Sequence, residues 1–245
     1  MILYPGGAIA CMKKKQFKPL QTPDGSVIDV WVTWPEEKAK YPAILLFDEG
    51  YGINAHIRSV AERLSREGYV VFIPDVYHRL GRQLQLSYGD IAAVHDHARS
   101  IDIEDLTLDL KTILSAMESF VYVDHTNIGT LGFSHGGRYS LLANSKFSLM
   151  AGVSYYGIHM DDLALANVGR ASPHLFFWGA QDSGAAPETI GRFQQNLRES
   201  GWDFTSVVIS YAGGGFFCDE QSSYHPLAAR QAWGHTLSFL DYLLK

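Results

Sequence analysis

The residues GFSHGG at 132–137 contain the pattern G-x-S-x-G, which can present a nucleophilic serine. A strand-like segment, 127–133, precedes the motif and a helical pattern follows it, as such a turn requires. Gly132 and Gly136 leave room for the backbones that crowd the turn, and the N–H of His135 would face a developing oxyanion. The motif therefore favours Ser134 as the nucleophile of an acyl-transfer reaction over an ordinary turn.

A serine nucleophile of this kind is followed along the chain first by an acid and then by a histidine. Asp182 comes just after the strand-like segment 174–179 and is the expected acid, although an aspartate there could also cap a turn. The histidine should follow the segment 205–211, where the sequence continues as AGGGFF and contains no histidine. Because a serine hydroxyl is harder to deprotonate than a thiol, this absence predicts a weak catalyst.

Two other residues could accept the proton of Ser134. His225 lies ten residues beyond the glycine loop that ends at Gly215 and is a weak candidate for the base. Glu49, if it is buried, could act as a weak base with a raised pKa, or it could be a structural carboxylate beneath the turn. Of the other histidines, His135 should point away from Ser134, and His235 in the final helix is expected to serve packing or the surface.

Metal and disulfide chemistry are not expected. His95 and His97 flank Asp96, but no third ligand is nearby in the sequence, so a solvated loop is favoured over a metal site. The two cysteines, Cys11 and Cys218, cannot form a disulfide framework, which fits a cytoplasmic protein. We therefore expect no metal ion and no other cofactor.

Strand-like and helix-like segments alternate along the chain. The alternation predicts an α/β fold with a mostly parallel central sheet and helices on both faces, in one domain over residues 21–245. Segment 27–34 alternates apolar and polar residues like a half-buried strand, whereas 43–47 is apolar throughout, like a strand covered on both faces. Further strands are expected at 70–74, 127–133, 150–156, 174–179 and 205–211, and helices at 57–67, 103–117, 189–200 and 228–244.

Residues 1–20 are expected to form a leader that is disordered or partly ordered. Residues 8–11 resemble a lipoprotein cleavage box only weakly, because the three lysines at 13–15 follow the apolar stretch. In a secretory segment, positive charge precedes that stretch.

The composition excludes several classes of protein. The chain has 245 residues with 20 Lys+Arg and 26 Asp+Glu, a net charge of −6, and 47% of its residues are hydrophobic. Such a chain can build a core, and it lacks the basic footprint of a nucleic-acid-binding protein. The apolar run 43–47 is far shorter than the roughly 18 residues that span a membrane. We expect a monomer or homodimer that acts on a small molecule, with neither nucleic acid nor membrane as a partner.

Several separated segments resemble the dienelactone hydrolase family. They are FDEGYGINAHIR at 47–58, GY at 68–69, PDVY at 74–77, the GFSHGG turn, FFCD at 216–219, SYHP at 223–226 and AW at 232–233. The resemblance covers roughly residues 22–243. It implies an α/β-hydrolase fold and the hydrolysis of esters or lactones through an acyl-enzyme.

The resemblance also implies roles for individual residues. Glu49 matches the family glutamate that activates the nucleophile, and Asp182 matches the acid of the triad. Arg79 looks like the arginine that binds the substrate carboxylate, and Tyr51 is expected to be a second substrate-binding residue. The last two implied roles belong to Gly50 and His135, whose N–H groups would form the oxyanion hole.

Two departures from the family pattern leave two functions open. Ser134 stands where the dienelactone hydrolases proper have cysteine, although relatives with serine exist. The loop that should hold the triad histidine looks two residues shorter and has glycine in its place. The chain could therefore be a weak ester or lactone hydrolase, or a non-catalytic relative that binds a small carboxylated ligand in the former active site.

Overall fold

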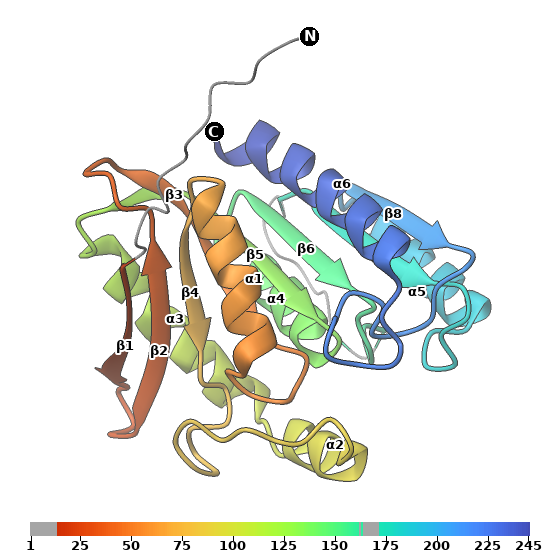
Figure 1. Cartoon of the computed structure of the whole chain (residues 1–245), viewed down its shortest axis with the longest axis horizontal. Coiled ribbons are helices and arrows are strands. Elements are labelled where there is room, and N and C mark those ends of the chain that lie inside the picture. The colour runs from red at the N-terminus through yellow and green to blue at the C-terminus, as the bar shows by residue number, and fades with distance from the viewer. Residues whose placement is uncertain (1–13, 162, 164–171) are drawn as a thin grey trace, which may run out of the picture.

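An eight-stranded sheet runs through the computed structural model, which describes residues 14–161, 163 and 172–245 (Figure 1). The strand order is β1-β2-β4-β3-β5-β6-β7-β8. Strand β2 is antiparallel to both β1 and β4, and the remaining pairs are parallel. The strands are Lys14–Gln21 (β1), Val27–Trp34 (β2), Tyr41–Phe47 (β3), Val70–Pro74 (β4), Val123–Phe133 (β5), Ala151–Tyr155 (β6), His174–Gly179 (β7) and Phe204–Ile209 (β8).

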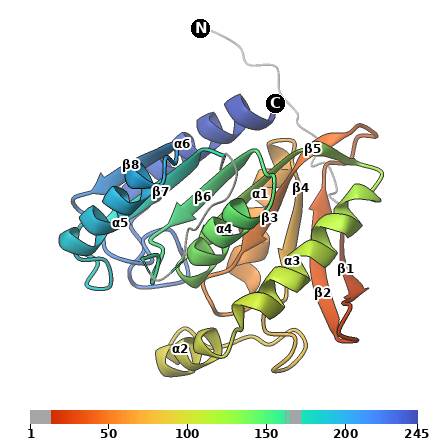
Figure 2. The ribbon, with the colours of Figure 1, turned by 180° about the vertical axis from the view of Figure 1, so that it is seen from behind.

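Helices cover both faces of the sheet, which confirms the predicted α/β arrangement. Figure 1 shows α1 (Ala55–Arg66) and α6 (Pro226–Leu244) in front of the sheet. Figure 2 shows α3 (Ile103–Glu118), α4 (His135–Lys146) and α5 (Pro187–Glu199) on the opposite face. The short helix α2 (Ile91–Arg99) lies apart from these two layers, below the sheet in both views.

The central strands are apolar because both of their faces are covered. In β3, Leu45 and Phe47 pack in the core on the side of α3 and α4, whereas Ile44 and Leu46 pack in the core on the side of α1 and α6. The prediction of a half-buried strand at 27–34 was wrong in one respect. Apart from Val27, every residue of β2 is buried, because both its edges are paired and both its faces are covered.

Two other expectations are corrected by the structure. Residues 14–20, assigned to the leader, belong to β1, which forms an antiparallel ladder with β2; residues 1–13 lie outside the described residues. Residues 14–20 have little apolar pattern, so their own side chains do not explain why they are ordered. Main-chain hydrogen bonds to β2 do explain it. The stretch around His95 and His97 is helix α2 rather than a loop, and the Asp90 side chain caps its N-terminus.

None of the helices among the described residues has the length and apolar character needed to cross a membrane.

Candidate active site

Ser134 lies between the end of β5 and the start of α4, in the strained turn that the motif predicts. Its backbone has φ 51° and ψ −116°, a conformation that a residue with a side chain rarely adopts. A Cβ atom at Gly132 would lie 1.9 Å from the carbonyl oxygen of Gly136, and one at Gly136 would lie 2.2 Å from that of Asp48. Both glycines are therefore required by close backbone contacts, and the turn holds Ser134 at the carboxyl end of β5.

The other predicted residues follow neighbouring parallel strands. Glu49 is the second residue after β3, which pairs with β5, and Asp182 follows β7, two strands away from β5. Since the carboxyl ends of parallel strands meet at one edge of a sheet, the three residues share the edge where α/β proteins bind ligands. The loop after β3 touches the turn directly, because a Cβ at Gly50 would lie 3.2 Å from Cδ2 of His135.

Glu49 is buried, with 6% of its surface exposed, and both carboxylate oxygens have partners. The Tyr156 hydroxyl donates to Oε1 over 2.5 Å, and the Gln221 amide donates to Oε2 over 3.0 Å. Burial raises the pKa of Glu49, and the bond from Tyr156 partly opposes this shift. These bonds hold the carboxylate in place, and the Cys218 side chain also stabilises its charge. A carboxylate has about four lone-pair sites, so it can still accept another proton.

Asp182 faces the glycine that replaces the expected histidine. The Gly184 N–H donates to Oδ1 of Asp182 over 2.8 Å. A Cβ atom built on Gly214 would lie 2.7 Å from Oδ2 of Asp182. A side chain at position 214 would therefore press against this carboxylate, the group that orients the histidine of a Ser-His-Asp triad.

The hydroxyl of Ser134 has no hydrogen-bond partner among the described residues. His225, the weak candidate for the base, caps α6 instead: its Nδ1 accepts the N–H of Ala228 over 3.3 Å. That bond requires the lone pair of Nδ1, so the ring proton resides on Nε2, which then cannot accept a proton. This arrangement disfavours His225 as the base.

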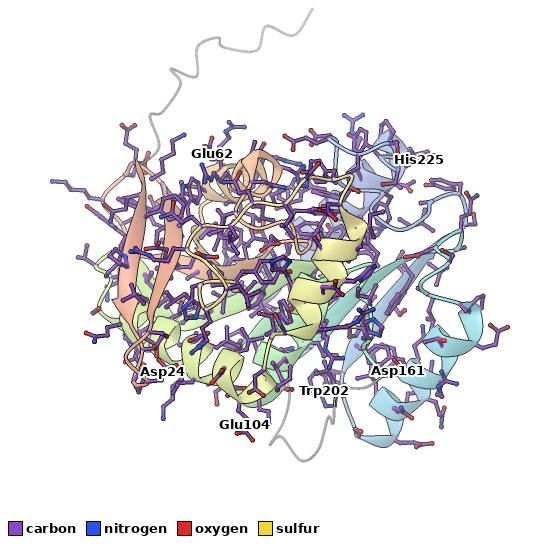
Figure 3. The ribbon with its side chains drawn as sticks, turned by 90° about the horizontal axis from the view of Figure 1, so that it is seen from below. Asp24, Glu62, Glu104, Asp161, Trp202 and His225 are labelled. Carbon is purple, nitrogen blue, oxygen red and sulfur yellow. The ribbon has the colours of Figure 1, made fainter. Side chains whose placement is uncertain are left out.

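Arg79 binds carboxylates of the protein itself. Its guanidinium donates to both oxygens of Asp109, over 2.6 and 3.0 Å, and to Asp24 over 2.9 Å. Figure 3 shows Asp24 and His225 on opposite sides of the molecule, so Arg79 lies far from the loop that leads into α6. The cavity that Arg79 lines has about 40 Å³, whereas ligand pockets usually hold about 300–1,000 Å³. The structure thus disfavours the expected role of Arg79 as a substrate anchor.

The two expected oxyanion donors differ in availability. The Gly50 N–H already donates to Oδ1 of Asp48 over 2.6 Å, so a substrate oxygen would have to compete for it. His135 is the first residue of α4, and the N–H groups of a first helical turn have no acceptor within the helix.

Tyr51, the other expected substrate-binding residue, is buried, and its ring packs edge-on against Tyr88 with centroids 4.7 Å apart.

A cavity of about 290 Å³ lies beside the turn. The His135 side chain lines it, together with His95 and His159, whose rings lie 5.5 and 6.5 Å from that of His135. Burial lowers the pKa of His135 to about 4, with smaller contributions from the charges of His95 and His159. This imidazole is therefore neutral at pH 7. Arg99 and Arg138 also line the cavity, which gives it a basic wall.

Sequence reasoning missed a second cluster around Glu49. A ligand atom from each of Glu49, His56 and Cys218 lies within 4.8 Å of the other two. His56 and Cys218 are 162 positions apart, and no spacing in the sequence could have paired them. Tyr156 and Gln221, which hold the Glu49 carboxylate, were missed for the same reason.

The fold and the turn together define an α/β-hydrolase. The family model of the dienelactone hydrolase family matches residues 28–244, so the chain belongs to this family of hydrolases. A protein of Synechocystis named "Putative carboxymethylenebutenolidase" is 27% identical over 214 residues, which are 81% of this chain and 85% of that protein. A Bradyrhizobium protein named "Probable 2-oxo-3-(5-oxofuran-2-ylidene)propanoate lactonase" is 24% identical, over 86% of this chain and 87% of its own length.

Solved structures share the fold. The crystal structure of "Putative Dienelactone Hydrolase" from Klebsiella pneumoniae has a TM-score of 0.84 at 23% identity, covering 94% of this chain and 99% of that one. The dienelactone hydrolase-like promiscuous phosphotriesterase P91, from metagenomic libraries, has a TM-score of 0.81 at 19% identity, with the same coverage of 94% and 99%.

Proposed function

We propose that this protein hydrolyses small carboxylic esters or lactones through an acyl-enzyme on Ser134, and that it does so weakly. The observation that carries the proposal is the strained turn, in which Ser134 has φ 51° between β5 and α4. A protein holds such backbone strain where a nucleophile must be exposed at the edge of a sheet. The names of two relatives, a carboxymethylenebutenolidase and a lactonase, support the substrate class.

In the proposed reaction, the Ser134 hydroxyl attacks the carbonyl carbon while its proton passes to the Glu49 carboxylate. The His135 N–H donates to the oxyanion, and the proton then goes to the leaving alcohol. Water hydrolyses the acyl-enzyme by the same steps in reverse. Substrates would enter through the cavity lined by His135. Turnover is slow because the residue beside Asp182 is Gly214, which has no imidazole to act as the base.

The glycine loop also favours a second candidate function, which is binding without turnover. A small carboxylated ligand could occupy the cavity beside His135, whose wall includes Arg99 and Arg138. In this case Ser134 would lack the base needed to form an acyl-enzyme.

Hydrolysis of p-nitrophenyl acetate and of an aryl lactone, combined with labelling by a fluorophosphonate, tests the proposal. We expect slow turnover and slow labelling of the unmodified chain, and both should be lost in Ser134→Ala. Ser59→Ala, which removes an exposed serine of α1, is the matched control and should change neither.

Three outcomes would contradict parts of this proposal. Absence of turnover and of labelling in the unmodified chain would leave the binding function. Turnover that survives Ser134→Ala would exclude Ser134 as the nucleophile. Rapid labelling at Ser134 would contradict the proposed low activity and would indicate that an efficient base activates this serine.

A further inference from the structure

Three buried side chains with metal-binding atoms lie close together near the carboxyl end of β3. Glu49 follows β3, His56 lies in the first turn of α1, and Cys218 lies in the segment between β8 and α6. A ligand atom from each residue lies within 4.8 Å of the other two. His56 is 4% exposed and Cys218 is 0% exposed, so the cluster is shielded from bulk water.

The imidazole of His56 is held in the tautomer that binds a metal. Its Nδ1 lies 2.9 Å from Oδ1 of Asp219, and an ionised carboxylate only accepts, so Nδ1 carries the proton. Nε2 is then left with a free lone pair. Within the described part of the chain, this buried Nε2 has no hydrogen-bond partner. Metal-binding histidines commonly donate their other nitrogen to a carboxylate in this way.

The other two members are groups that a cation would stabilise. Burial raises the pKa of the Cys218 thiol to about 11, with a further contribution from the charge of Glu49. Burial also raises the pKa of Glu49. A divalent ion would balance the charges of both the thiolate and the carboxylate, and its binding would release the thiol proton to solvent.

We propose that Glu49, His56 and Cys218 form a binding site for Zn²⁺, with water in the fourth position. One thiolate, one imidazole and one carboxylate are a donor set that suits zinc, whereas Mg²⁺ and Ca²⁺ prefer oxygen ligands alone. This site departs from the sequence-based expectation that the protein needs no metal. It shares Glu49 with the proposed reaction, so a bound ion would withdraw that carboxylate from Ser134.

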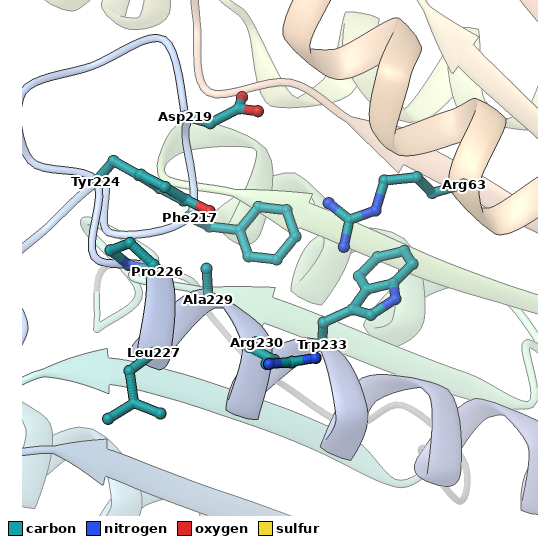
Figure 4. A pocket seen from close by; sticks show the side chains of 9 residues that line it. All are labelled: Arg63, Phe217, Asp219, Tyr224, Pro226, Leu227, Ala229, Arg230 and Trp233. Carbon is teal, nitrogen blue, oxygen red and sulfur yellow. The ribbon is translucent and has the colours of Figure 1, made fainter. Parts of the chain in front are cut away.

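Figure 4 shows Asp219, the carboxylate that orients His56, on the wall of a cavity of about 630 Å³. Arg63 lies over the ring of Trp233 at 4.1 Å on the same wall. The Asp219 side chain is 66% exposed, so this partner of His56 faces solvent. Asp219 therefore connects the buried His56 to this cavity, whereas the three ligands themselves are buried.

The proposal is tested by titrating the metal-free full-length protein with Co²⁺. This ion reports on zinc sites through its visible and charge-transfer absorption bands. We expect one equivalent to bind with a thiolate-to-cobalt charge-transfer band, and one equivalent of Zn²⁺ to displace it. Cys218→Ser should abolish the band, and His56→Gln should weaken binding severely. Cys11→Ser and His125→Gln, which alter the other cysteine and an exposed histidine, are the matched controls and should bind as the unmodified chain does.

Asp219→Asn tests the positioning role, because losing such a partner typically weakens metal affinity about 10–100-fold. Circular dichroism confirms that each variant is folded. The absence of stoichiometric binding, or a charge-transfer band that persists in folded Cys218→Ser, would overturn the site. Loss of the band in Cys11→Ser would also overturn it. The readout is spectroscopic, so the result is independent of whether Ser134 hydrolyses an ester.

Discussion

Replacing Gly214 by histidine should increase the rate of ester hydrolysis. A Cβ at this position points at the Asp182 carboxylate, with Oδ2 at 2.7 Å, Cγ at 2.9 Å and Oδ1 at 3.0 Å. These atoms are the end of a side chain, not backbone, and two of them lie under 3.0 Å, so the Asp182 carboxylate must shift to admit a side chain. Position 214 is also absent from the positive-φ glycines of the described chain, so a side chain adds no backbone strain.

The size of the gain follows from the role of the base. A positioned general base typically contributes about 10²–10⁴-fold to the rate, or about 3–5 kcal/mol at about 1.4 kcal/mol per factor of ten. The loop is tight around Asp182 and was not shaped for an imidazole, so we expect the lower end. Gly214→His should raise kcat/KM for p-nitrophenyl acetate about 10²-fold.

Gly213→His is the matched control, because the nearest atom to a Cβ there is the backbone oxygen of Gln181 at 3.6 Å, not a carboxylate. Adding Asp182→Asn or Ser134→Ala to Gly214→His should remove the gain, since the acid fixes the tautomer of the imidazole. The reasoning is refuted if Gly214→His is no faster than Gly213→His, or if the gain survives Ser134→Ala.

Three further predictions concern stability and specificity. Gly136→Ala should lower the free energy of unfolding in urea by about 3 kcal/mol, because its Cβ would lie 2.2 Å from a backbone oxygen. Gly191→Ala is the control: a Cβ there meets open space in α5, so the free energy of unfolding should rise by up to about 1 kcal/mol. Equal changes in the two variants would contradict the argument that Gly136 is crowded. Burial raises the pKa of Asp75 to about 6, above its unfolded value, so this group stabilises the fold as the pH falls. It should contribute about 2 kcal/mol between pH 7 and pH 4, and Asp75→Asn should flatten that dependence in urea titrations. Arg79→Ala should lower stability by about 3 kcal/mol by leaving the buried Asp109 without its ion pair, and should affect acidic and neutral esters alike. A loss confined to acidic esters would restore its role as an anchor.

The sequence by itself determined the layout of the fold and the position of the proposed nucleophile. Apolar runs such as 43–47 and amphipathic segments such as 103–117 are local patterns, and their alternation allows few arrangements other than a parallel sheet between helices. The turn around Ser134 was also predictable, because its glycines and the flanking strand and helix adjoin one another in the chain. The absence of a histidine from the loop before Phe216 was visible for the same reason.

Only the tertiary structure decided which side chains meet. Arg79 lies in a segment that matches the family, but its guanidinium is bound by Asp24 and Asp109. The closeness of these three residues depends on how the β1–β2 turn, α3 and the loop after β4 pack. The assembly of Glu49, His56 and Cys218 likewise depends on three segments that converge only when the sheet forms. Hydrogen bonds and metal ligation act over about 2–3 Å, a distance that sequence spacing determines only within a single turn or strand.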